Sequence, residues 1–261
     1  MSLGTANLGI SELLEIVKKT ASKAASSLDQ LRQDGCFDYE FDLTEEREVK
    51  AKADKIIEKI VLEDLVDTGI PVLSEESFGS FRHSEAGLKF ILDPIDGTVN
   101  FVRGIGLASV SIALFDHDKP LFGVLAVYPS GELAWGGPGI GSFLASSAIQ
   151  VSEHAERSKS ILCTGIPARL DLTDQLQRER FVKEITKFAK VRMLGAASIS
   201  LLNVAKGSAD CYSEQDVMIW DIAAGLAILL GAGGKYSLTQ GNHSYSRNVV
   251  AHNGRIELTV D

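Results

Sequence analysis

Cysteine is scarce in this chain, and its spacing fits neither a zinc site nor a set of disulfides. The 261 residues include three cysteines, Cys36, Cys163 and Cys211, which lie far apart. The absence of any Cys-x-x-Cys pair argues against a zinc site of that type. An odd number of isolated cysteines favours a reducing environment, so we expect a cytoplasmic location.

Long apolar runs and an excess of positive charge are also missing. The longest apolar segment, residues 222–232, is too short to cross a bilayer, and the N-terminus has no signal-peptide pattern. We therefore expect no membrane association. The net charge is −9, from 35 acidic and 26 basic residues, which argues against direct binding to nucleic acid. A small anionic substrate remains compatible with this charge if metal ions supply positive charge locally.

The hydrophobic content is sufficient for a large core. It amounts to 45% of a chain long enough for one large domain or two packed subdomains. We place a boundary near residue 150, which gives an N-terminal α+β subdomain, residues 1–150, and a C-terminal α/β subdomain, residues 151–261. We expect the first to carry most metal ligands and the second to carry substrate contacts and one metal ligand.

Hydrophobic periodicity predicts an α/β protein. We expect helices at residues 10–31, 53–66, 177–189, 197–205 and 219–231. We expect strands at residues 70–73, 88–96, 110–115, 121–127, 132–135, 141–145, 160–165, 191–194 and 209–213. The acidic segment 36–50 has no clean period and is interpreted as a loop that can contain short strands.

The stretch DPIDGTVNF, residues 93–101, follows one of these strands and carries two aspartates. Pro94 favours an extended conformation at Asp93, and Gly97 allows a tight turn. Thr98 is a good N-cap for a short helix. Two carboxylates beside a helix N-terminus suit Mg²⁺ and phosphate. The alternative is an ordinary Asp-Gly turn with a capping threonine.

Three further acidic positions lie at the ends of predicted elements. Glu75 follows the strand at 70–73, Asp221 precedes a long apolar helix, and Asp54 is in the first turn of another helix. Each has a simple alternative: a solvated acidic loop, a helix N-cap, or a favourable position in the helix dipole. Taken together, these positions and the two aspartates fit a site for two or three divalent ions that hold a phosphate.

These residues resemble the inositol monophosphatase family of Mg²⁺-dependent, lithium-sensitive phosphatases. DPIDGTVNF resembles its first signature, WDIAAG at 220–225 its second, and SEES at 74–77 its glutamate segment. LCTGIP at 162–167 and VRMLGAAS at 191–198 resemble further blocks. The resemblance implies a layered α-β-α-β-α sandwich and usually a homodimer. It also implies that a small phosphorylated compound is the substrate.

The resemblance also implies the metal ligands. Glu75, Asp93 and the carbonyl of Ile95 would bind the first Mg²⁺. Asp93, Asp96 and Asp221 would bind the second, and Glu75 would bind a third ion through water.

Further roles follow from the same resemblance. Asp54 and Thr98 would pair and position or activate the attacking water, although the segment before Asp54 lacks the threonine that the family often has. The N–H groups of Gly97 and Thr98 would hold the phosphate. The remaining substrate contacts would come from Asp96, Asp221, Gly195, Ala196, Ala197 and Glu214.

The leading hypothesis is hydrolysis of inositol 1-phosphate to inositol and phosphate. Within the same fold, the alternatives are a 3′(2′),5′-bisphosphate nucleotidase, a fructose-1,6-bisphosphatase and a histidinol-phosphatase. A different alternative is a binding or regulatory protein that keeps the fold and contacts the transcription machinery. No Gly-x-Ser-x-Gly elbow is present, which disfavours a Ser-His-Asp hydrolase.

Overall fold

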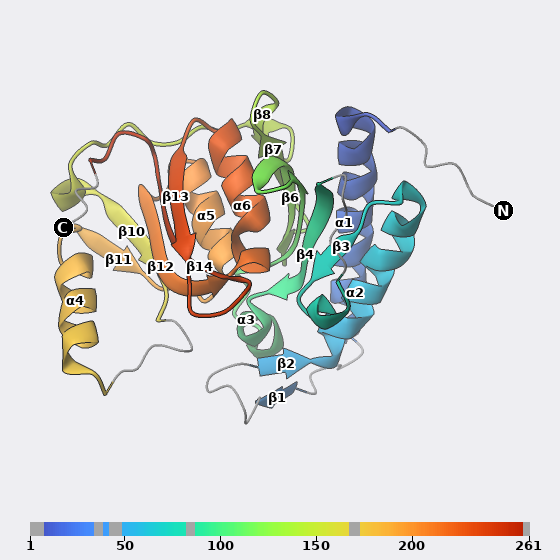
Figure 1. Ribbon diagram of the computed structural model, residues 1–261, viewed down its shortest axis with the longest axis horizontal. Coiled ribbons are helices and arrows are strands. Elements are labelled where there is room, and N and C mark those ends of the chain that lie inside the picture. Colours follow the sequence, from blue (N-terminus) through green and yellow to red (C-terminus); the bar gives the residue numbers. More distant parts are fainter. Residues whose placement is uncertain (1–7, 34–38, 42–48, 82–86, 167–172, 258–261) are drawn as a thin grey trace.

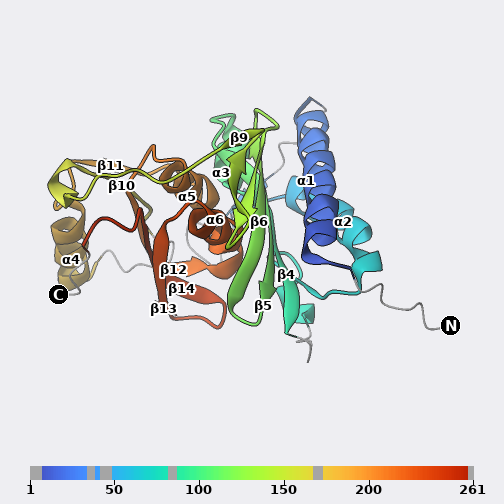
Figure 2. The same ribbon diagram turned by 90° about the horizontal axis from the view of Figure 1, so that it is seen from above.

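The chain folds into five alternating layers of helix and sheet. The computed structural model describes residues 8–33, 39–41, 49–81, 87–166 and 173–257. Helices α1 (Ile10–Gln33) and α2 (Lys52–Leu65) form one outer layer, and α4 (Gln175–Ile185) forms the other. Between them lie a seven-stranded sheet, the helices α5 (Ala197–Ala205) and α6 (Ile219–Gly231), and a five-stranded sheet (Figures 1 and 2). The expected α-β-α-β-α sandwich is confirmed.

The first sheet brings two acidic strand ends to the same edge. Its strands, in spatial order, are β3 (Val72–Ser74), β4 (Leu88–Asp96), β5 (Ala108–Asp116), β6 (Lys119–Tyr128), β7 (Leu133–Gly137), β8 (Gly141–Leu144) and β9 (Ser147–Ala148). The β3–β4 pair is parallel and the other pairs are antiparallel. Because parallel strands end at the same edge, Glu75, just after β3, lies beside the end of β4.

The second sheet contains two strands that the sequence pattern did not predict. Its order is β11 (Lys190–Arg192), β10 (Ile161–Thr164), β12 (Cys211–Met218), β14 (Ser246–His252) and β13 (Lys235–Gln240). The last two, β13 and β14, form an antiparallel pair. In β13 the residues alternate between half-buried and exposed, and only two of its six residues, Tyr236 and Leu238, are apolar. This is too weak a signal to stand out from a loop.

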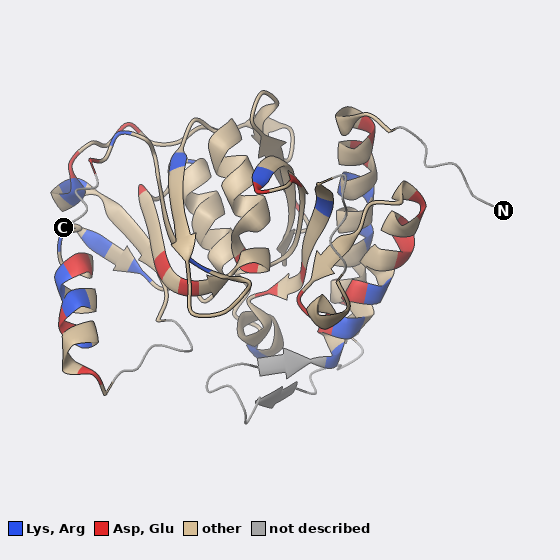
Figure 3. Ribbon diagram, in the orientation of Figure 1, with Lys and Arg blue, Asp and Glu red and all other residues tan. Residues whose placement is uncertain are grey.

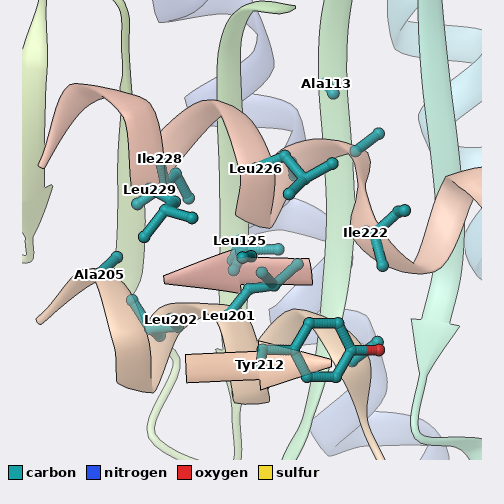
Figure 4. Packing of buried hydrophobic residues seen from close by; sticks show 14 of the residues in the cluster. Ala113, Leu125, Leu201, Leu202, Ala205, Tyr212, Ile222, Leu226, Ile228 and Leu229 are labelled. Atoms are coloured by element: carbon teal, nitrogen blue, oxygen red, sulfur yellow. The ribbon is translucent and has the colours of Figure 1, made fainter. Parts of the chain in front are cut away.

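The middle helices are buried between the two sheets. All the residues of α6 from Ile222 to Leu229 are buried, as expected for a helix that is apolar on every side (Figure 4). The packing against β6 is close, because a Cβ added to Gly123 would lie 2.6 Å from the Cα of Ala224. The side chain of Leu201 on α5 occupies the space beside Gly225 in the same way. The α5–α6 layer therefore has little freedom to move relative to the first sheet.

The outer helices and short elements complete the fold. Leu13, Val17 and Leu28 of α1 are buried with Ile57 and Val61 of α2 in a second core against the first sheet. Helix α3 (Thr98–Arg103) follows β4 directly. The strands β1 (Tyr39–Phe41) and β2 (Val49–Ala51) form an antiparallel pair within the acidic segment, and three 3₁₀ turns cover Val66–Thr68, Phe78–Ser80 and Arg157–Lys159.

The rest of the acidic segment lies outside the described residues. Among the helices that the structure describes, none is both long and apolar enough to cross a membrane.

Candidate active site

A bulge in β4 turns Asp93 and Asp96 toward the same region. Asp93 pairs with Ser111 and Asp96 with Ser109, so Pro94 and Ile95 together lie opposite Val110. In a regular strand, residues three positions apart point to opposite faces. The extra residue of a bulge shifts this alternation by one, so that Asp93 and Asp96 can point to the same face. Pro94 has no N–H to offer the ladder and is tolerated at a bulge. The backbone N–H of Ile95 donates to Oδ1 of Asp93 at 2.9 Å, which fixes that carboxylate.

Five carboxylates from four segments act on one another in this region. Burial raises the pKa of Asp93 well above its ordinary value, and Glu75, Asp221, Asp96 and Asp54 raise it further. The pKa of Asp221 is also well above its ordinary value, through burial and then through Asp96, Glu75 and Glu214. Figure 3 shows acidic positions close together near the end of β4, on β12 and at the start of α6. All the charged neighbours that shift the pKa of Asp93 are carboxylates, so their ionised forms require a cation.

The buried Asp96 holds the N-terminus of α5. Its carboxylate accepts hydrogen bonds from the N–H of Ala197 at 3.3 Å, from the N–H of Ser198 at 2.7 Å, and from the hydroxyl of Ser198. The N-cap residue of α5, Ala196, has no side chain that could do this. Burial raises the pKa of Asp96 to about 6 even though these hydrogen bonds lower it. Asp96 therefore fixes the segment that contains Gly195, Ala196 and Ala197 against the end of β4.

Asp54 and Thr98 form the pair that the resemblance implies. The Thr98 hydroxyl lies 3.3 Å from Oδ1 of Asp54 and 3.0 Å from the carbonyl oxygen of Ile95. One hydroxyl proton cannot serve both acceptors fully, so the two contacts compete. Thr98 is the first residue of α3, and its N-cap is Gly97 with φ +86. The prediction that Thr98 caps this helix is therefore wrong, because the turn requires a left-handed residue at the cap.

Asp221 is likewise not a helix cap. Helix α6 begins two residues earlier, after the N-cap residue Met218, and Asp221 lies in its first turn. The Met218 backbone N–H donates to the Asp221 carboxylate and lowers its pKa. The first turn of α6 thus directs Asp221 toward the other carboxylates.

Glu214 lies on β12, at the border of this cluster. The Tyr212 hydroxyl donates to Oε2 of Glu214 at 2.9 Å, and burial raises the pKa of Glu214 to about 7. A Cβ on Gly165 would lie 2.5 Å from Oε1 of Glu214, so only glycine leaves room for this carboxylate. Tyr212 and Gly165 thus hold Glu214 in place, and sequence reasoning identified neither of them.

A second bulge separates Glu214 from Asp221. Gln215 and Asp216 together lie opposite Asn248, and Asp216 has φ +56. Asp216 tolerates this left-handed conformation because its carboxylate accepts hydrogen bonds from the N–H of Asn242 at 2.8 Å and from the Ser246 hydroxyl. Tyr212 and Val217 are an odd number of positions apart and would point to opposite faces of a regular strand, but the bulge allows both to face the core.

The remaining predicted substrate contacts lie near the first signature. A Cβ on Gly97 would be 3.1 Å from the Cβ of Ala196, so these two segments touch. Gly195 has φ +73 and packs against Asn100, whose Nδ2 donates to the carbonyl of Leu194 at 2.7 Å. The structure therefore brings the sequence-predicted residues together in one region. The supporting side chains, Asn100, Ser109 and Ser198, were missed, because single polar residues in apolar segments carry no recognisable pattern.

The donor set fits Mg²⁺. Hard carboxylate oxygens are its preferred ligands, and Mg²⁺ keeps several waters, so a few protein ligands suffice. Within the described ranges, no three acidic, histidine or cysteine side chains are arranged as a preformed metal cluster. Burial, followed by the neighbouring carboxylates, raises the pKa values of Asp93 and Asp221, so a cation would favour their ionised forms.

Comparisons with known proteins agree with this geometry. The family model described as the inositol monophosphatase family matches residues 10–259. The inositol-1-monophosphatase of Synechocystis sp. is 34% identical, with 78% of this chain and 72% of that protein covered. The Nus factor SuhB of Pasteurella multocida is 32% identical, with 78% and 77% covered. A crystal structure of the extragenic suppressor protein suhB from Bartonella henselae superimposes with a TM-score of 0.80 at 29% identity, with 93% and 94% covered.

Proposed function

Because this chain belongs to the inositol monophosphatase family and is therefore a phosphoric monoester hydrolase, we propose that it hydrolyses inositol 1-phosphate with Mg²⁺ as cofactor. The observation that carries the proposal is a group of mutually repelling carboxylates beside the start of α3, of which Asp93 and Asp96 are buried and Glu75 and Asp221 are half-buried. Such a group suits a divalent cation and, through it, a phosphate.

In this proposal the carboxylates hold the metal. Glu75, Asp93 and the Ile95 carbonyl bind one ion, and Asp93, Asp96 and Asp221 bind a second. A third ion, bound through water at Glu75, belongs to the same proposal. Bound Mg²⁺ supplies electrostatic stabilisation of the phosphoryl group and lowers the pKa of a coordinated water.

The other residues position the reactants. Thr98, which lies within hydrogen-bond distance of Asp54, orients the attacking water, and Asp54 accepts its proton through the Thr98 hydroxyl. The backbone N–H groups of Gly97, the N-cap, and Thr98, the first residue of α3, have no partner within the helix. The Gly97 N–H hydrogen-bonds to the Asp96 carboxylate, and in this proposal it and the Thr98 N–H would hold the phosphate oxygens.

In this proposal the phosphate lies between the metal ions and the start of α3, and the alcohol portion of the substrate extends away from it, toward Glu214. Glu214 accepts hydrogen bonds from its hydroxyls, while Gly195, Ala196 and Ala197 line the pocket wall. Asp96 and Asp221 complete the contacts. In this proposal, the small size of Gly195, Ala196 and Ala197 leaves the ring of the polyol room beside the metal ions.

Phosphate release measured over a panel of substrates tests the proposal. The panel contains inositol 1-phosphate, 3′-phosphoadenosine 5′-phosphate, fructose 1,6-bisphosphate and histidinol phosphate, each with Mg²⁺ and with or without lithium. We expect the highest kcat/KM for inositol 1-phosphate, with inhibition by lithium. A higher kcat/KM for another member would refute the assignment of the substrate while leaving the phosphatase chemistry in place.

A homodimer is part of the proposal. Four large apolar side chains remain exposed in neighbouring segments beside the site: Val99, Ile105, Leu107 and Met193. Asn100 ties these segments together, because its Nδ2 donates both to Leu107 O at 3.0 Å and to Leu194 O at 2.7 Å. Contact with a second copy would remove this apolar surface from water. Sedimentation analysis should show a dimer that Ile105→Asp dissociates, whereas a monomeric wild-type protein would refute this arrangement.

A second role has one observation in its favour. A relative from Pasteurella multocida is named a Nus factor, which raises the binding of a transcription protein as an additional function. Capture of a transcription protein from native lysate by the tagged chain, compared with and without Mg²⁺, tests this role. We also propose a cytoplasmic location, which is compatible with both roles. Cys163 and Cys211 are free and buried, as expected for a protein in a reducing environment.

A further inference from the structure

A cavity lies between the two sheets, separate from the carboxylates of the candidate active site. It has a volume of about 610 Å³ and is bounded by β3, β4 and β5 on one side and by β13 and β14 on the other. Its floor is apolar and includes Leu73, Ile91, Phe115 and Ile219. This size and this apolar lining are typical of small-molecule sites.

The cavity contains positive charge with little compensation. Among the described residues, Lys89 and Arg247 line it together with one carboxylate, that of Asp118. The Lys89 side chain is only 18% exposed, and its ion pair with Asp118 spans 4.0 Å to a carboxylate in open solvent. Arg247 donates to the carbonyl oxygens of Ser244 and Ser246, which carry no negative charge. In a protein of net charge −9, this cavity is therefore locally positive.

Hydrogen-bond donors face the same space. Tyr236 and Tyr245 line the cavity. Neither hydroxyl has a hydrogen-bond partner among the residues that the structure describes. Burial, followed by the Asp118 carboxylate, raises the pKa of Tyr236, so that its hydroxyl remains a donor. Two phenolic donors and a mostly covered ammonium group thus line an apolar cavity.

From this combination we propose that the cavity binds a small organic anion with a flat apolar body. The acidic group of the ligand would be held by Lys89 and the hydroxyls of Tyr236 and Tyr245, and its body would lie on Ile91 and Phe115. The cavity is separate from the carboxylate cluster, which repels anions in the absence of metal. It nevertheless adjoins that cluster, because Ile91 and Ile219 each come two residues before one of its aspartates, Asp93 and Asp221.

Titration of the full-length protein with 8-anilinonaphthalene-1-sulfonate tests the proposal. The probe is an aromatic sulfonate, and EDTA is included so that no metal ion can recruit it to the carboxylates. We expect one binding site and a rise in probe fluorescence. Lys89→Met keeps the unbranched shape and most of the length of the side chain but removes its charge. It should weaken binding by about tenfold or more, the usual effect of losing a charge-assisted hydrogen bond.

Two further variants keep the test decisive. Tyr236→Phe removes one hydroxyl with no loss of packing and should weaken binding several-fold, even if Lys89→Met folds poorly. Lys235→Met is the matched control, because Lys235 is exposed on the same strand as Tyr236 and does not line the cavity. Equal affinity in the wild type and in folded Lys89→Met and Tyr236→Phe would overturn the proposal. A crystal structure with the probe bound elsewhere would do the same.

Discussion

Replacing Glu214 with glutamine should stabilise the metal-free protein at neutral and alkaline pH. Burial raises the pKa of Glu214 from its ordinary 4.5 to about 7, so the folded state holds this proton more tightly than the unfolded state does. Glutamine has the shape of the protonated acid, and its carbonyl oxygen can still accept the hydrogen bond from Tyr212. The variant therefore removes the cost of a buried charge and keeps the packing.

The size and the pH range of the effect follow from this shift. This rise in the pKa of Glu214 corresponds to about 3 kcal/mol in the free energy of unfolding, at roughly 1.4 kcal/mol per pKa unit. Because the pKa of Glu214 is higher in the folded state, protonated Glu214 contributes fully to the stability of the wild type below about pH 4.5. This contribution is lost as the pH rises to about 7. The free energy of unfolding of Glu214→Gln minus that of the wild type should therefore grow across this range and level off above it.

Urea unfolding in EDTA, followed by tryptophan fluorescence at several pH values between about 5 and 8, measures this difference. At alkaline pH the variant should also unfold at a temperature higher by roughly 6–12 °C, given about 2–4 °C per kcal/mol for a domain of this size. Glu132→Gln, at an exposed position, is the control for removing a solvated charge. A difference for Glu214→Gln that does not change with pH would refute the reasoning.

Three other predictions concern catalysis and packing. Asp93→Asn should abolish Mg²⁺-dependent phosphate release, because it removes the carboxylate proposed to bridge two ions; a wild-type rate would contradict the two-metal arrangement. Thr98→Ala should lower kcat more than it raises KM in steady-state kinetics, and an unchanged kcat would remove Thr98 from the mechanism. Gly123→Ala should lower the free energy of unfolding by about 1–3 kcal/mol in urea, because the new Cβ would lie 2.6 Å from the Cα of Ala224. Gly79→Ala, which meets nothing within 4 Å, is its control, and equal losses in the two variants would contradict the packing argument.

The sequence alone was sufficient for the features that depend on local patterns. The apolar period of α1 and α2 and the long apolar run of α6 located these helices, and α5 and α6 begin and end where they were predicted. DPIDGTVNF identified the strand that ends in acid, because proline, glycine and paired aspartates have strong local preferences. The resemblance carried by this motif also predicted the layer order and the pairing of Asp54 with Thr98.

Other features depended on contacts between distant segments. The β13–β14 pair was missed, because its strands are short and only partly buried. The hydrogen bonds of Asp96 to Ser198 join residues 102 positions apart, and no local pattern records such a partner. The two bulges, at Pro94–Ile95 and Gln215–Asp216, depend on the register of a neighbouring strand.

The sequence thus determined which residues carry the chemistry, and the tertiary structure decided how they face one another. Local preferences act within a few residues, whereas register, burial and electrostatic repulsion arise only when distant strands and helices pack together. This is why the acidic residues could be found in the sequence, while the raised pKa values of Asp93, Asp221 and Glu214 required the fold.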